Sequence, residues 1–261
     1  GLEQNPRLLS DISGDIVLAR TPEPGAAATP PATPPAAPAG AVEPAGQSTG
    51  AFTVQAARSG GTRTGTLTLP GGVKVAFAWI PEGDGNRKPF WMSLHEITQE
   101  QWHAVMGANP ASFTHEDPDL LPVENVSWDD CAQFLAKLNG MNSGTFRLPN
   151  RRQWEYACRA GASGDYYFGI DQTKLGDYAW FASNSNHQTN PVGAKGANAW
   201  GLHDTLGNVW EWCADEAGGG MYEQCGGSWT SNAWKCTVTA RRTGSPTDRG
   251  SDLGLRIIRE P

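Results

Sequence analysis

The residues of this chain best suited to redox or metal chemistry are its five cysteines. They are Cys131, Cys158, Cys213, Cys225 and Cys236. Their odd number and the lack of paired metal-ligand spacing favour neither a complete disulfide framework nor a zinc site. We expect most of them to be buried as small apolar side chains. Only Cys225 and Cys236 lie close enough along the sequence to suggest a bonded pair.

A second chemically active group is basic and lies near the C-terminal end. Residues 235–259 contain six Lys or Arg residues against two Asp residues. These cations are either buried or paired within the scaffold, or they form a basic surface. The whole chain carries a formal charge of -7, which opposes non-specific attraction to phosphate backbones. We therefore expect no nucleic-acid partner.

The helices and strands that must position these groups are expected only after a long N-terminal segment of about 50 residues. Residues 21–50 contain 17 Ala or Pro among 30 residues. Such a segment buries too little area to offset its ordering entropy, and its prolines keep it extended. We expect a disordered linker at 21–50 and one folded domain at 51–261. Residues 1–20 are expected to form either a short helix or the tail of an upstream domain.

Turn and capping signals predict the elements at the start of the folded domain. Alternating runs at 66–69 and 73–80 flank a Leu-Pro-Gly-Gly turn, which predicts a β-hairpin. Three capping boxes predict short helices that stop at glycines. The capping pairs are Thr98 with Gln101, Ser127 with Asp130, and Asn150 with Gln153, and the stops are Gly107, Gly140 and Gly161. Strands at 237–241 and 255–258 are expected to join the hairpin in one sheet.

The hydropathy pattern bears on the compartment. No run approaches the ~20 apolar residues that span a bilayer, and no basic-then-apolar signal segment opens the sequence. We expect a soluble chain without a membrane span. It acts either in the cytoplasm or at the cell surface, where an upstream anchor or effector domain would hold it.

Seven short motifs occur in order along the second half of the chain. They are PVENVSW at 122–128, FRLP at 146–149, WEYA at 154–157, GLHD at 201–204, GNVWEW at 207–212, GGSW at 226–229 and GLR at 254–256. Together they resemble the formylglycine-generating-enzyme, or sulfatase-modifying-factor, family over roughly residues 75–259. The resemblance implies an α+β, C-type lectin-like fold of the formylglycine-generating-enzyme subclass. Such a fold is loop-rich, with a short antiparallel sheet and a few short helices.

The resemblance also indicates where a catalytic site would lie. Enzymes of this family oxidise a substrate cysteine with two copper-binding cysteines, placed two and seven residues after the aromatic of the Gly-Gly-Ser-aromatic motif. The matching positions here are Ser231 and Cys236. A hydroxyl replaces a soft thiolate poorly at a copper site. We therefore expect no copper and no catalysis, with an oxidase or degenerate enzyme homologue as the alternative.

The C-terminal segment is more similar to the variable proteins of diversity-generating retroelements, which have the same fold. The resemblance implies a variable region at 226–256 on a scaffold held by Trp229, Arg241, Arg249, Gly254 and Arg256. The residues expected to be variable and ligand-binding are Thr230, Ser231, Asn232, Trp234, Lys235, Thr243, Gly244, Ser245, Thr247, Asp248, Gly250, Ser251 and Asp252. Nine of them are expected to form one exposed face: Ser231, Asn232, Trp234, Lys235, Thr243, Ser245, Asp248, Gly250 and Asp252. The ligand would be an unidentified protein or surface molecule. A structural domain without a diversified face is a third possibility.

A structural calcium ion is a further implication of the family resemblance. The motif match assigns its ligands to the carboxylates of Asp204 and Glu211 and to the carbonyls of Gly207 and Val209. Hard oxygen ligands of this kind suit calcium. In the alternative interpretation, both carboxylates pair with backbone amides or with an arginine.

Overall fold

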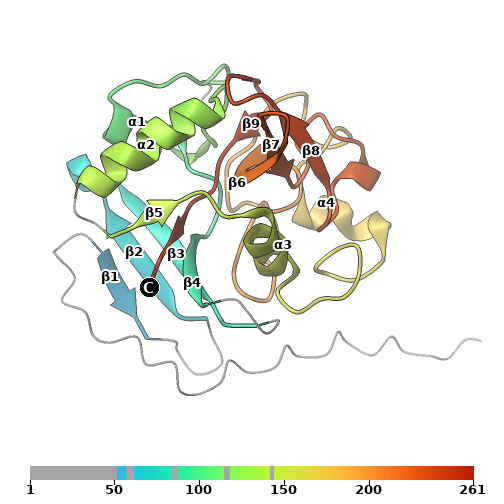
Figure 1. The fold of residues 1–261 in the computed structure, drawn as a ribbon. Coiled ribbons are helices and arrows are strands. Elements are labelled where there is room, and N and C mark those ends of the chain that lie inside the picture. The colour runs from blue at the N-terminus through green and yellow to red at the C-terminus, as the bar shows by residue number, and fades with distance from the viewer. Residues whose placement is uncertain (1–51, 57–61, 84–87, 115–117, 142–143) are drawn as a thin grey trace, which may run out of the picture. The chain divides into compact units, whose positions relative to one another are not determined.

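The computed structural model describes residues 52–56, 62–83, 88–114, 118–141 and 144–261 (Figure 1). The expected N-terminal segment at 1–20 and linker at 21–50 lie outside the described residues. Within the described part, two sheets, four α-helices and long loops form the α+β, loop-rich fold that the sequence predicts. None of the described helices is both long and apolar enough to cross a membrane.

The first sheet is antiparallel and contains the predicted hairpin. Its order is β1 (Phe52–Gln55), β2 (Thr64–Thr68), β3 (Lys74–Ile80), β4 (Phe90–Ser93), β10 (Ile258–Arg259) and β5 (Phe146–Arg147). The β2–β3 turn places Gly71 and Gly72 at positive φ, which glycine adopts without steric cost. Alternate side chains of β3 enter different clusters: Phe77 lies in one and Ile80 in the other. This sheet therefore separates two hydrophobic cores.

The three predicted helices begin at their predicted caps. They are α1 (Gln99–Met106), α2 (Trp128–Gly140) and α3 (Arg151–Arg159), and each capping box makes both of its hydrogen bonds. Trp102 of α1 stacks on Phe134 of α2, with ring centroids 4.9 Å apart, in the first core. Trp154 of α3 lies in the second core beside the short helix α4 (Leu175–Tyr178). The α3 helix ends at Arg159, its C-cap is Ala160, and the expected Gly161 follows directly.

The second sheet was not predicted from the sequence. Its order is β8 (Arg241–Gly244), β7 (Met221–Cys225), β6 (Trp210–Gly218) and β9 (Leu253–Gly254), and β6 pairs with β9 in parallel. The expected strand at 237–241 is wrong, because the Ala240 amide instead closes a turn onto Thr237, and β8 joins β7. Of the expected strand at 255–258, Ile258 forms part of β10, which joins the first sheet as predicted, whereas residues 255–257 are not in a strand.

All five cysteines are buried and unbonded. The Sγ atoms of Cys213 and Cys225, on the adjacent strands β6 and β7, lie 3.6 Å apart. Cys225 therefore has Cys213 as its sulfur neighbour, and not Cys236 as their sequence proximity suggested. The expectation that these residues act as small apolar core side chains is confirmed for their burial.

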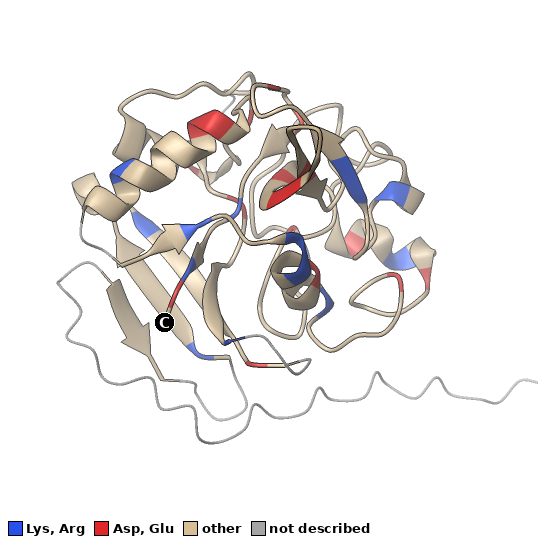
Figure 2. Cartoon of the chain, in the orientation of Figure 1, with Lys and Arg blue, Asp and Glu red and all other residues tan. Residues whose placement is uncertain are grey.

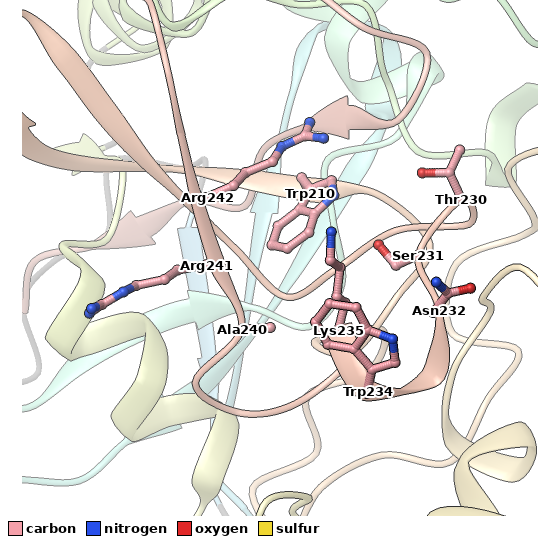
Figure 3. Close-up of a pocket in the computed structure, with 9 residues that line it drawn as sticks. All are labelled: Trp210, Thr230, Ser231, Asn232, Trp234, Lys235, Ala240, Arg241 and Arg242. Carbon is pink, nitrogen blue, oxygen red and sulfur yellow. The ribbon is translucent and has the colours of Figure 1, made fainter.

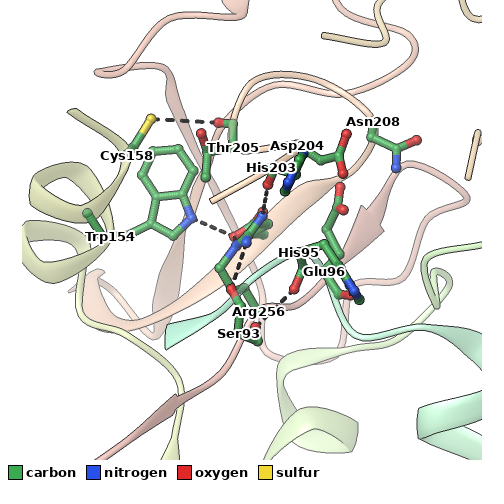
Figure 4. A network of polar contacts seen from close by, with 12 residues as sticks. Ser93, His95, Glu96, Trp154, Cys158, His203, Asp204, Thr205, Asn208 and Arg256 are labelled. Carbon is green, nitrogen blue, oxygen red and sulfur yellow. Dashed lines mark hydrogen bonds and ion pairs between the residues drawn. The ribbon is translucent and has the colours of Figure 1, made fainter. Parts of the chain in front are cut away.

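One buried ion pair connects the two sheets, α3 and the central loops. Arg256, between β9 and β10, contacts the Glu211 carboxylate of β6 at 3.0 Å, and both side chains are almost completely excluded from solvent. Arg256 also donates to the carbonyls of Ser93, at 2.9 Å, and His203, at 2.7 Å (Figure 4). The Trp154 indole donates to Glu211 Oε2 at 2.6 Å. This pair is the point at which segments far apart in the sequence meet.

We expect the substitution Arg256→Met to lower the free energy of unfolding by about 3–5 kcal/mol, because it leaves the buried Glu211 carboxylate without its cation. Urea unfolding at pH 7 measures this loss. The matched control is Arg249→Met, since Arg249 pairs with Asp130 while nearly half of its side chain is exposed. That variant should lose less than about 1 kcal/mol. Equal losses in the two variants would contradict the central role of the buried pair.

Candidate functional site

The C-terminal segment bounds a cavity of about 300 Å³ (Figure 3). It is lined by Trp210, Thr230, Ser231, Asn232, Trp234, Lys235, Ala240, Arg241 and Arg242. Five of these nine residues belong to the predicted ligand-binding set. Three of the nine are cationic and none is anionic, so the cavity has the chemistry of an anion-binding site. Figure 2 shows the basic residues of β8 and of the turn that carries Lys235.

Tight turns bring the walls of this cavity together. Gly226 and Gly227 follow β7 with φ values of 101° and 85°, a conformation that favours glycine. A Cβ atom on Gly227 would lie 2.7 Å from the Lys235 carbonyl oxygen, so the backbone approaches closely here. The chain then forms a 3-10 turn at Ala233–Lys235 and returns to β8. The side chains of this turn therefore face those at the start of β8.

Two tryptophan–cation contacts shape the wall. The Arg242 guanidinium lies 4.9 Å from the ring centroid of Trp210, and Lys235 Nζ lies 5.0 Å from that of Trp234. Arg242 is also held by two hydrogen bonds to Asp252, at 3.0 and 3.2 Å. Its charge is thereby paired. The Trp234 side chain is 65% exposed, which leaves a large aromatic surface open to a ligand.

Two residues of the predicted ligand-binding set, Ser231 and Gly244, are buried, and the prediction that Ser231 lies on the exposed face is wrong. The Ser231 hydroxyl accepts the Ser228 amide at 3.0 Å and so closes the turn from within. Gly244 has no space for a side chain, because a Cβ atom there would lie 2.3 Å from the Gln224 amide nitrogen and 3.0 Å from Trp212. Ser231 still contributes to the cavity wall, whereas Gly244 does not.

The other predicted ligand-binding residues divide into two groups. Four of them line the cavity and Thr243 lies in β8, whereas the other six lie in the loop after β8. Thr230, Asn232, Trp234, Lys235, Thr243, Thr247 and Asp248 are exposed, and Ser245, Gly250, Ser251 and Asp252 are partly buried. The loop 245–252 does not line the cavity, because it docks against the start of α2. There the Asp129 amide donates to the Pro246 carbonyl and Arg249 pairs with Asp130.

The residues expected to hold the scaffold mostly do so. The Trp229 indole donates to the Ser251 carbonyl at 2.8 Å, and a Cβ atom on Gly254 would lie 2.4 Å from the Val123 carbonyl oxygen. Arg249 and Arg256 make the ion pairs described above. Arg241 is the exception. Its side chain is exposed and lines the cavity, so its expected scaffold role is wrong.

The positions that match the catalytic cysteines lack the features of a copper site. Burial raises the pKa of the Cys236 thiol to about 12, so this sulfur stays protonated at neutral pH. The thiolate is the form that binds metals and attacks substrates. Ser231 supplies a hydroxyl that is already engaged by the Ser228 amide. The two side chains therefore do not provide a pair of thiolates.

The predicted calcium ligands lie in the buried polar network around Arg256. Asp204 accepts the Gly193 amide at 2.6 Å through one oxygen, and its other oxygen has no protein partner. Glu211 is engaged by Arg256 and Trp154, as the alternative interpretation proposed. Of the two carboxylates, Asp204 therefore fits a cation site and Glu211 does not. The described residues contain no group of three or more His, Cys, Asp or Glu arranged to hold a metal.

A third carboxylate of this network, Glu96, is buried and was not predicted from the sequence (Figure 4). Neither of its oxygens has a protein partner. Burial raises the pKa of Glu96 well above its usual range, and repulsion from Asp204 and Glu211 adds to this shift. Burial likewise raises the pKa of Asp204 to about 6. The excess negative charge of this network requires either a proton or a cation to neutralise it.

The substitution Asp204→Asn distinguishes these two possibilities. The folded state raises the pKa of Asp204 from 3.8 to about 6. Its stabilising contribution is therefore present below about pH 4 and is lost as the pH rises through 6. Thermal unfolding in EDTA should show that stability falls less between pH 5 and pH 8 in the variant, by about 1.4 kcal/mol. Asparagine tolerates the left-handed backbone at this position, where φ is 55°.

Calcium provides the second half of this test. If Asp204 binds calcium, the ion should raise the melting temperature of the parent protein at pH 8 and leave that of Asp204→Asn unchanged. Asp177→Asn, at an exposed position in α4, is the control for surface charge. An equal response of all three proteins to pH and to calcium would contradict any role of Asp204 in charge neutralisation.

The chain is similar to several curated proteins. It is 28% identical over 226 residues to the chaperone protein LppX of Paenibacillus barcinonensis, covering 65% of this chain and 80% of that protein. It is 34% identical over 170 residues to the inactive C-alpha-formylglycine-generating enzyme 2 of Mus musculus, covering 57% and 52%. It is 29% identical over 199 residues to the formylglycine-generating enzyme of Thermomonospora curvata, covering 72% and 55%. The chain thus spans about half the length of the latter two relatives.

Two solved structures share the fold. Treponema denticola variable protein 1 has a TM-score of 0.68 and 28% identity, covering 76% of this chain and 99% of that one. This similarity confirms the resemblance to variable proteins. PvdO from Pseudomonas aeruginosa has a TM-score of 0.61 at 21% identity, covering 80% and 98%, and shows the common fold. Residues 49–261 match the family described as the sulfatase-modifying factor enzyme 1-like domain, and the chain belongs to that family.

Proposed function

We propose that this domain is a ligand-binding display protein whose C-terminal surface is diversified by a retroelement. A fixed scaffold would present variable side chains to a protein or surface ligand. The observation that carries the proposal is the cavity whose wall is built largely from the predicted variable run at 230–235. The similarity to Treponema denticola variable protein 1, over 99% of that chain, supports it.

The contacts of the scaffold are compatible with a changeable surface. Exposed side chains such as Asn232, Lys235 and Thr243 make few contacts that the fold requires, and such positions usually change stability by no more than about 0.5 kcal/mol. Trp234 offers a rigid aromatic anchor of the kind that dominates binding energy at interfaces. Fixed elements and replaceable side chains thus lie next to each other.

The second candidate function is an oxidase of the formylglycine-generating type. It is favoured by the similarity to the Thermomonospora curvata enzyme. Against it stand Ser231, whose hydroxyl is used within a turn, and Cys236, whose buried thiol has a raised pKa. These residues support a protein that binds without catalysing cysteine oxidation.

A combinatorial library tests the display function. Randomising 230–235 and 243–244, followed by selection for protease-resistant protein, should return many residue types at Asn232 and Thr243. Their direct neighbours Ser231 and Gly244 are the matched controls and should remain nearly unchanged. The reason is that Ser231→Ala leaves the Ser228 amide without its acceptor, at a cost of about 1–3 kcal/mol, and Gly244 has no room for a side chain.

The same library should contain variants that bind different peptides. If Asn232 and Thr243 proved as intolerant as their neighbours, or if no randomised variant gained a ligand, the display function would be contradicted. The origin of the variation is tested separately in the genome. A near-identical template repeat beside a reverse transcriptase gene is the expected finding.

The enzyme alternative is tested by incubating the protein with copper, oxygen and a sulfatase-motif peptide. We expect the peptide mass to remain unchanged, since Ser231 has no thiol and Cys236 alone cannot supply the pair of thiolates that the copper site of the family's enzymes uses. The variant Ser231→Cys restores the second cysteine of the family's enzymes and shows whether Ser231 alone prevents the reaction. Formylglycine formation by the parent protein would overturn the non-catalytic assignment.

A further inference from the structure

The cavity differs in charge from the molecule that carries it. The chain as a whole has a formal charge of -7, yet the cavity is lined by Lys235, Arg241 and Arg242 and by no carboxylate. Such a local reversal of charge concentrates field lines of one sign in a concave site. The ligand group that this cavity favours is therefore an anion.

The pairing of the basic residues shows which cations are available. Arg242, Arg249 and Arg256 are paired with Asp252, Asp130 and Glu211, respectively. By contrast, the structure gives Lys235 and Arg241 no carboxylate partner within the described ranges. Arg242 also donates to the Gln224 amide oxygen at 2.5 Å. Lys235 and Arg241 are thus the cations of the cavity that have no carboxylate partner among the described residues.

A contact with the Trp234 ring positions the Lys235 ammonium group at the cavity. The ammonium group lies over the Trp234 indole, 5.0 Å from its ring centroid. Figure 3 shows Lys235 among the other lining side chains, whereas the Arg241 guanidinium points away from Lys235 and Trp234. The Asn232 amide and the Thr230 hydroxyl add neutral polar groups to the same wall. An anion that enters would therefore meet charge-assisted donors beside an exposed aromatic plane.

The size and charge of the site narrow the class of anion. A volume of about 300 Å³ is at the small end of ligand sites and suits one or two side chains. A long polyanion would meet repulsion from the rest of the acidic chain. The exposed Trp234 surface favours an aromatic or apolar group beside the anion. A carboxylate side chain flanked by an aromatic residue meets all three conditions.

We infer that the cavity captures an acidic peptide segment of a protein ligand, with Lys235 binding a carboxylate, Arg241 attracting a further carboxylate of the segment, and Trp234 packing against a neighbouring aromatic side chain. This inference rests on the proposed binding function and specifies its ligand class. Because Lys235 and Trp234 are predicted variable positions, the preference belongs to this particular variant of the surface.

The test uses the full chain and three fluorescein-labelled nonapeptides that differ only at their centre. The centres are Glu-Tyr-Glu, Gln-Tyr-Gln and Glu-Ala-Glu, in a Gly-Ser background. Fluorescence anisotropy should show that Glu-Tyr-Glu binds at least tenfold more tightly than Gln-Tyr-Gln, and that added salt weakens the binding. Lys235→Gln and Arg241→Gln should each weaken it severalfold. Trp234→Ala should remove the preference for Glu-Tyr-Glu over Glu-Ala-Glu.

Lys137→Gln is the matched control, because Lys137 is an exposed lysine on α2. Equal binding of the Glu and Gln peptides, equal losses in Lys137→Gln and Lys235→Gln, or no binding of any peptide would overturn the acidic-ligand inference. Complete competition by millimolar inorganic phosphate would also overturn it, since the site would then be a simple phosphate site.

A second experiment distinguishes failure of the acidic-ligand inference from failure of the proposed binding function. Random peptides displayed on phage are selected on the same full chain and on its Trp234→Ala variant. Enrichment of acidic peptides that require Trp234 is the expected result. Enrichment of non-acidic peptides that require Trp234 would refute the acidic ligand and retain the binding function. Absence of any enriched peptide, together with an intolerant library at 230–235, would refute both.

Discussion

The buried contact between Arg256 and Glu211 holds together a domain that has little regular structure in its second half. A guanidinium can donate five hydrogen bonds in a fixed plane. Here these donors reach the end of β4 through Ser93, the loop at His203, and β6 through Glu211. Helix α3 is attached through Trp154. Because a buried ion without its partner costs several kcal/mol, all these segments must adopt their places together.

The buried polar network around this pair contains more carboxylates than cations. Glu96, Asp204 and Glu211 are all buried near one guanidinium, which can compensate only one of the three carboxylates. The pKa values of Glu96 and Asp204 are raised as a result of burial, with repulsion between the carboxylates adding to it. The domain thus stores a pH- or cation-dependent contribution to stability in its centre, away from the cavity. Ligand binding at the surface and charge neutralisation in the core use different residues.

The sequence predicted the elements whose signals are local. Capping boxes at Thr98, Ser127 and Asn150 specify helix starts through side chains three residues apart, and each formed as expected. The β6–β7 hairpin was missed because its turn is three consecutive glycines, 218–220, in a stretch that otherwise has the composition of loops. The motif match grouped the residues of 230–235, five of which line one cavity. It could not show that Ser231 points inward or that Arg241 is exposed, since both depend on contacts made after the chain folds.

The turn that carries the cavity residues is held mainly by its backbone. The Ser231 amide donates to the Ser228 carbonyl at 2.9 Å, and the Lys235 amide to the Asn232 carbonyl at 2.8 Å. Backbone bonds of this kind do not depend on the identity of the side chains at 232, 234 and 235. Ser231 is the buried residue of this run, and its side chain closes the turn. The exposed Thr230 hydroxyl also contacts the Ser228 hydroxyl, at 2.9 Å. A surface can change its contact chemistry without losing its shape when the shape is encoded in main-chain bonds, in close-packed glycines and in one inward hydroxyl. The cavity at 230–235 meets that condition.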